Sequence, residues 1–196
     1  MFTVGVAGGI GSGKSTVCRV FSVLGIPVFS SDDEGKRLLG EDDRLRAQLS
    51  AAFGEGVLAG GKLDRRALAA RVFNNPAALQ RLNAIVHPAV RNAFAAWAVA
   101  QHAPYVINEA AILVETGGHE QLDHLVVVTA PEQERIRRVV ERDGATEAQV
   151  RARMQHQTDD RARLAVAGSV ITNDNRAMVI PQVLAVHHKL MNLARA

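Results

Sequence analysis

The chain has 196 residues, 47% of them hydrophobic and 22% charged, which excludes disordered, collagen-like and disulfide-scaffold classes. The net charge is only +3, which does not favour binding to nucleic acid or to a membrane surface. We expect no signal peptide. The single cysteine cannot form an internal disulfide. No apolar run approaches the ~20 residues that span a bilayer. These features predict a single cytoplasmic domain over 1–196, with no obligate protein partner.

Short β-rich runs alternate with helical periods, a pattern typical of a parallel sheet with helices on both faces. The apolar runs predict strands at 2–7, 26–29, 105–107, 125–128 and 170–172. Apolar residues at helical spacing predict a helix at 15–24 and another at about 177–193. The sequence therefore predicts an α/β fold with a five-stranded parallel sheet.

A long stretch between the second and third predicted strands contains no convincing strand. Its apolar spacing predicts helices at 43–53, 64–73, 76–85 and 88–102. A doubly wound fold needs only one crossover helix here, so most of the stretch is surplus. It either thickens one edge of the domain or forms a substrate-binding insert, which we delimit as 57–103.

Residues 131–163 form a second unusual segment, because it holds eight arginines and seven acidic residues. Such a charge run is typical of a solvated helical face with ion pairs between successive turns. The alternative is a mobile lid whose arginines contact a bound phosphate chain.

The segment from Gly8 to Ser15 matches the phosphate-loop pattern G-x-x-x-x-G-K-[ST] in full, directly after a predicted strand and at the start of a predicted helix. Glycines let successive backbone N–H groups turn toward phosphate oxygens, and the new helix adds its own free amides. Lys14 is expected to reach the β- and γ-phosphates, and the Ser15 hydroxyl to ligate Mg²⁺. The expected ATP-binding residues are Gly9, Gly11, Ser12, Gly13, Lys14, Ser15 and Thr16.

The class of phosphate-loop protein follows from what accompanies the motif. The chain lacks the N-K-x-D motif of switch GTPases and is short for a motor ATPase, so a small-molecule kinase fits best. Such an enzyme must exclude water from the transferring phosphoryl group, which a lid achieves. Glu109 ends the third predicted strand, where it either acts on Mg²⁺ through water or caps the next turn.

Two aspartates follow the second predicted strand, at the sheet edge where such folds bind ligands. Asp32 is expected to accept a proton from an attacking hydroxyl or to hold Mg²⁺, and Asp33 to cap the helix that begins there. The alternative for Asp32 is also a helix cap.

From end to end the chain resembles the dephospho-coenzyme A kinase family. The segments that carry the resemblance are Gly8–Ser15, Leu24–Val28, Asp32, Asp64–Leu68, Asn75–Pro76, Leu82–Pro88, Ala111–Glu115, Arg142–Asp143, Gln157 and Val170–Asn173. The chain departs from the family in having Ser30 in place of a first aspartate and Ala111 in place of a proline.

The resemblance implies a nucleoside-monophosphate-kinase-like three-layer fold and phosphorylation of the ribose 3′-hydroxyl of dephospho-CoA by ATP, with Mg²⁺. It further implies that Asp32 is the base, that Arg142 of the lid meets the phosphates, and that Arg65 and His87 line the acceptor cleft. From the residues alone, His87 could instead fill a local turn before Pro88.

Two other functions are considered. One is a different phosphate-loop kinase, with a nucleoside monophosphate or shikimate as acceptor. The other is a nucleotide-binding regulator that holds ATP without acceptor chemistry, which Asp32 beside an intact Lys14 disfavours.

Overall fold

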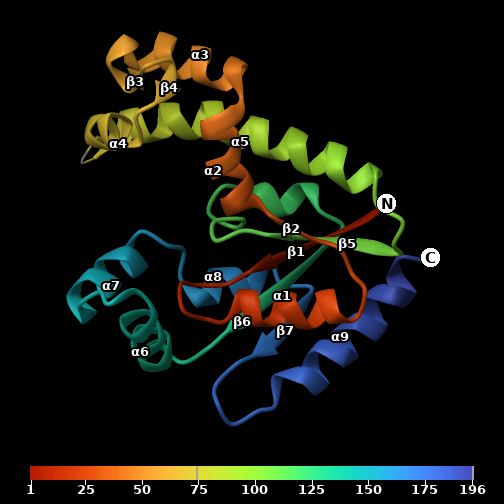
Figure 1. The fold of residues 1–196 in the computed structure, drawn as a ribbon. Coiled ribbons are helices and arrows are strands. Elements are labelled where there is room, and N and C mark those ends of the chain that lie inside the picture. The colour runs from red at the N-terminus through yellow and green to blue at the C-terminus, as the bar shows by residue number, and fades with distance from the viewer. Residues whose placement is uncertain (74, 196) are drawn as a thin grey trace. The chain divides into compact units, whose positions relative to one another are not determined.

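The computed structural model describes residues 1–73 and 75–195, which form two compact units. The first unit comprises Met1–Ser30 and Ala98–Ala196, and the second comprises Ser31–Trp97 (Figure 1). The insert was expected at 57–103, whereas the second unit begins at Ser31 and ends at Trp97. The earlier start arises because the helices after residue 30 already belong to this unit.

The first unit is built on a parallel sheet with the order β2-β5-β1-β6-β7. Its strands are β1 (Phe2–Ala7), β2 (Val28–Ser30), β5 (Tyr105–Glu109), β6 (His124–Thr129) and β7 (Ser169–Thr172). The predicted five-stranded parallel sheet is confirmed. β2 begins two residues later than expected because Pro27, which has no N–H, only offers its carbonyl to Ile107, at 2.9 Å.

Alternate residues of β6 point to opposite faces of the sheet, and both faces are buried. Val126 and Val128 join a core with α1 (Lys14–Val23) and α9 (Val179–Leu193), which lie together in Figure 1. Leu125 and Val127 join a smaller core with Leu113 and other residues of the segment that follows β5.

The remaining helices of the first unit occupy the arginine-rich segment. They are α6 (Glu132–Asp143), α7 (Glu147–Gln155) and α8 (Asp160–Ala165). A 3₁₀ turn, η2 (Gly118–Gln121), lies before this segment, between β5 and β6. Ile136, Val139 and Val150 form the apolar contact between α6 and α7. The segment therefore has its own small core.

The second unit consists of helices around one apolar core. Its elements are α2 (Ser31–Glu41), α3 (Asp43–Phe53), η1 (Glu55–Val57), β3 (Leu58–Ala59), β4 (Lys62–Leu63), α4 (Arg65–Val72) and α5 (Pro76–Val99), whose last residues belong to the first unit. Leu38, Leu45, Leu49, Phe53 and Val57 are buried at its centre.

Two expectations for this stretch were wrong. The helices expected at 76–85 and 88–102 are the single helix α5, with Pro88 inside it. Leu82, Ile85 and Ala89 pack on the same core on both sides of Pro88, so burial outweighs the lost backbone hydrogen bond. A two-residue hairpin, β3–β4, also occurs where no strand was expected.

Among the described residues, no helix is long and apolar enough to cross a membrane.

Leu49→Ala should lower the free energy of unfolding by about 2–5 kcal/mol, because Leu49 is completely buried in the core of the second unit. Leu79→Ala is the matched control, since Leu79 is 46% exposed and its truncation should cost no more than about 0.5 kcal/mol. Urea unfolding followed by far-ultraviolet circular dichroism measures both. Equal losses would contradict the burial of Leu49.

Candidate functional site

The phosphate loop joins the end of β1 to the first turn of α1. Gly11 (φ 76°) and Gly13 (φ 95°) adopt left-handed conformations that favour glycine, and Ser12 N–H donates to the Gly9 carbonyl at 3.1 Å. Among the described residues no side chain caps α1, and its first turn has no acidic residue. The helix therefore presents backbone donors to an anion at the loop.

Lys14 is placed over the start of this loop. Its ammonium group donates to the Gly8 carbonyl at 2.9 Å and lies 3.5 Å from the Gly9 carbonyl. These contacts hold the positive charge beside the backbone donors, which is where a phosphate chain would need it.

Ser15 and Glu109 form a polar pair beside Lys14. Glu109 ends β5, where it is in register with Val6 of β1, and its carboxylate accepts a hydrogen bond from the Ser15 hydroxyl at 3.1 Å. Burial raises the pKa of the nearby Cys18 thiol far above its usual range, and the Glu109 charge raises it further. A hydroxyl and a carboxylate this close are the hard oxygen ligands that Mg²⁺ prefers.

The loop after β7 is tied to the phosphate loop. Asn173 donates from Nδ2 to the Ser12 carbonyl at 2.9 Å, and a Cβ on Gly13 would collide with the same amide. Arg138 on α6 bridges the two loops, donating to the Gly11 carbonyl at 3.4 Å and to the Asn173 carbonyl at 3.0 Å. The resemblance had placed Asn173 in a family motif, whereas nothing in the sequence distinguished Arg138 from its neighbours.

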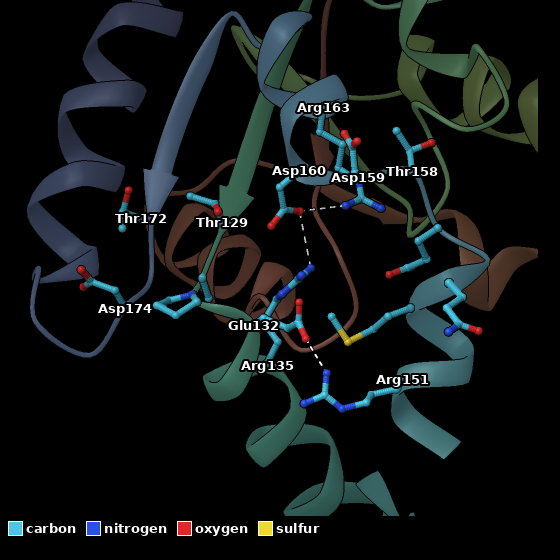
Figure 2. Close-up of a pocket in the computed structure, with 15 residues that line it drawn as sticks. Thr129, Glu132, Arg135, Arg151, Thr158, Asp159, Asp160, Arg163, Thr172 and Asp174 are labelled. Atoms are coloured by element: carbon cyan, nitrogen blue, oxygen red, sulfur yellow. Dashed lines mark hydrogen bonds and ion pairs between the residues drawn. The ribbon is translucent and has the colours of Figure 1, made fainter. Parts of the chain in front are cut away.

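A pocket of about 890 Å³ lies in the same unit, at the carboxyl ends of β6 and β7 (Figure 2). Its walls come from these strand ends and from α6, α7 and α8, and they include Thr129, Glu132, Arg135, Arg151, Asp160 and Arg163. Arg135 also lies against Gly9, so the pocket adjoins the phosphate loop.

The arginines of the segment 131–163 divide into two groups. Arg137 and Arg142 are exposed and pair with acidic side chains, as expected for a solvated helical face. Arg135 and Arg163 are buried in the pocket wall. The exposed pairs fit a solvated helical face, and the lid interpretation stays a prediction.

Arg142, the expected lid arginine, lies at the end of α6 and is not part of the pocket wall. Its Nε donates to Asp143 at 2.7 Å, and this hydrogen bond lowers the pKa of Asp143. The geometry gives Arg142 no contact with the phosphate loop, so its role on the phosphates stays a prediction.

The expected base belongs to the second unit. α2 begins at Ser31, directly after β2, so Asp32 is its second residue and is exposed. Asp33 lies inside the first turn and pairs with Lys36 at 2.8 Å, and its expected role as a cap stays a prediction.

The two expected acceptor residues also lie in the second unit. Arg65 begins α4 and donates to the Lys36 carbonyl at 2.8 Å. His87 lies within α5, so the alternative that it fills a turn before Pro88 is wrong. Burial lowers the pKa of His87, and the charge of Arg91 lowers it further, so the ring is favoured in its neutral form.

Comparison with known proteins gives consistent matches. A family model described as Dephospho-CoA kinase matches residues 2–178. A Dephospho-CoA kinase of Thiobacillus denitrificans is 40% identical over 197 residues, which cover 99% of this chain and 98% of that protein. The solved Dephospho-CoA kinase of Campylobacter jejuni superposes with a TM-score of 0.68 at 25% identity, covering 97% of each chain.

A shikimate kinase from Acinetobacter baumannii, solved with shikimate, superposes with a TM-score of 0.56 at 15% identity. The superposition covers 98% of this chain and 94% of the shikimate kinase. At this identity the likeness shows a shared fold.

Gly11→Ala should weaken ATP binding at least about tenfold, equivalent to ~1.4 kcal/mol. The new methyl group would collide with the backbone of Arg135 and would also require a left-handed alanine. Gly25→Ala is the control, because Gly25 also has a positive φ (82°) but has open space where the methyl group would lie. The ATP affinity of the Gly25→Ala variant should equal that of the wild type. Calorimetric titration with ATP measures both, and equal affinities would contradict the close contact at Gly11.

Proposed function

The chain belongs to the dephospho-CoA kinase family, and on that premise we propose how its residues carry out the ATP-dependent phosphorylation of dephospho-CoA in coenzyme A biosynthesis. The observation that carries the proposal is the phosphate loop with Lys14 fixed on two of its carbonyls and Ser15 paired with Glu109. Family membership favours dephospho-CoA over a nucleoside monophosphate or shikimate as acceptor.

The phosphate loop binds the triphosphate of ATP. The amides of the loop and of the first turn of α1 donate to phosphate oxygens, and Lys14 carries its charge onto the β- and γ-phosphates. These groups are positioned before ATP arrives, so little reorganisation is needed as negative charge shifts in the transition state.

Mg²⁺ would be held by the Ser15 hydroxyl, with Glu109 acting directly or through a bound water molecule. When bound, the ion neutralises charge on the β- and γ-phosphate oxygens. The 3.1 Å hydrogen bond between the Ser15 hydroxyl and the Glu109 carboxylate keeps these two side chains together. Asp32 is a further proposed ligand of the ion or of its waters.

The chemistry is an in-line displacement at the γ-phosphorus. The ribose 3′-oxygen of dephospho-CoA forms the new bond to phosphorus while the bond to the β,γ-bridging oxygen breaks, and ADP leaves. Asp32 accepts the hydroxyl proton, Arg142 supplies positive charge when the segment 131–163 closes, and Arg65 and His87 contact the acceptor. The helical insert thus binds the acceptor, and the arginine-rich segment excludes water.

An acceptor panel tests this function. ADP formation by the purified chain with ATP and Mg²⁺ is measured with dephospho-CoA, with nucleoside monophosphates and with shikimate. We expect rapid ADP formation with dephospho-CoA alone, and coenzyme A as the product. A faster rate with another acceptor would contradict the proposed substrate, and a slow rate independent of any acceptor would favour a nucleotide-binding regulator.

Asp32→Asn should lower kcat at least ~100-fold with near-normal ATP binding, because the amide keeps the shape but cannot take up the proton. Asp33→Asn is the neighbouring control: it removes an exposed ion pair with Lys36, so kcat should change by less than about fivefold. Single-turnover phosphorylation of dephospho-CoA by each variant measures the step. The opposite ranking would move the base to Asp33, and mild effects from both would exclude the pair as the base.

A further inference from the structure

Two buried arginines, Arg135 and Arg163, lie with their acidic partners beside the phosphate loop. Arg163, only 1% exposed, pairs with Glu115 at 2.7 Å and with Asp160 at 2.9 Å. The same Asp160 oxygen lies 3.4 Å from Nη1 of Arg135, so that two arginines share one aspartate, as Figure 2 shows. Arg135 is therefore the more loosely held of the two.

Arg135 contacts the phosphate loop at two places. A Cβ on Gly9 would collide with Nη1 of Arg135, and a Cβ on Gly11 would collide with the Arg135 backbone. Gly9 does not adopt a left-handed conformation, so close approach, rather than backbone conformation, accounts for glycine there. One side chain and its own backbone thus support both glycines.

The same side of the loop is held by the connection between α7 and α8. The Ile10 N–H donates to the Gln157 side chain at 2.8 Å, and the next residue, Thr158, donates its N–H to Glu115 at 3.1 Å. Glu115 thus joins Arg163 to this connection. The contacts link α6, α8 and the segment after β5 to the first half of the loop.

Stability alone does not account for this arrangement. Buried ion pairs contribute little net stability, because desolvation offsets their attraction. Among the described residues, Nε of Arg135 and Nε of Arg163 are buried without a hydrogen-bond partner, which adds a further cost. The close contact of Arg135 with Gly9 and Gly11 points instead to a role in positioning the phosphate loop.

We propose that Arg135 is a positioning residue for phosphoryl transfer, which supports Gly9 and Gly11 of the phosphate loop and is itself held by Asp160, the carboxylate that also pairs with Arg163. The inference rests on the proposed function, because it assumes that this loop binds the transferred phosphate. Loop donors act through their fixed placement, so a small displacement of Gly9 or Gly11 weakens them at the phosphates. Arg135 touches no substrate in this scheme and acts through the loop.

The test compares Arg135→Gln with Arg137→Gln. Arg137 lies on the same helix but is exposed and pairs with Glu134 and Glu141, so it offers the same chemical change without a loop contact. The measurements are ATP affinity by calorimetry without acceptor, then kcat and the KM of each substrate, then the melting temperature. We expect Arg135→Gln to weaken ATP binding and to lower kcat/KM for ATP at least about tenfold, with the KM for dephospho-CoA unchanged.

A merely structural role would give a different result. It would lower the melting temperature and the active fraction while leaving ATP affinity and both KM values as in the wild type, and that result overturns the proposal. Equal effects of Arg135→Gln and Arg137→Gln on ATP binding would also overturn it. If Arg135→Gln does not fold, Asp160→Asn decides, because it keeps Arg135 and removes its charged partner. Weakened ATP binding in that variant supports the proposal, and wild-type ATP affinity overturns it.

The calorimetric measurement separates this inference from the proposed function. A wild-type chain that binds ATP but does not phosphorylate dephospho-CoA would refute the proposed acceptor. The effect of Arg135→Gln on ATP affinity would still decide the role of Arg135.

Discussion

The burial of β1 is the constraint on which the site depends. β1 pairs with β5 on one edge and β6 on the other, and Val4 and Val6 are completely buried. The start of the phosphate loop is therefore fixed, while Val17 and Phe21 fix α1 in the same core. Because both ends are held, the intervening loop keeps its backbone donors converged, which the binding of a phosphate chain requires.

Neighbouring elements complete that loop with different kinds of contact. β5 supplies Glu109 to Ser15, and the loop after β7 supplies Asn173 to the Ser12 carbonyl. α6 contributes Arg135 and Arg138, whose side chains reach the loop from successive turns of one helix. The short motif therefore marks the loop in the sequence, but residues far from it in the chain complete the loop's contacts.

Among the arginines of α6–α8, burial determines how much each ion pair contributes to stability. Exposed pairs such as Arg137–Glu141 and Arg142–Asp143 contribute little to stability, because water screens them. Arg163 is buried, so losing both Glu115 and Asp160 would leave its charge uncompensated, at a far higher cost. The same residue type therefore serves solubility at one position and the geometry of the site at another.

The sequence by itself determined the features that depend on short motifs and on the spacing of apolar residues. The phosphate loop and the five strands of the parallel sheet follow from residues near one another in the chain, and the family follows from the order of short motifs along it. Periodicity also placed α3 correctly at Asp43–Phe53. It failed at Pro88, where packing of both halves of α5 on one core outweighed a local helix breaker.

Only the tertiary structure decided which arginine meets the loop. Arg135, Arg138 and Arg142 lie at helical spacing on α6, and sequence pattern alone does not rank them. Their partners are Gly9, Asn173 and Asp143, of which only the last is a neighbour in the chain. Contacts between residues more than thirty positions apart depend on how strands and helices pack, and a motif read along the chain carries no information about that packing.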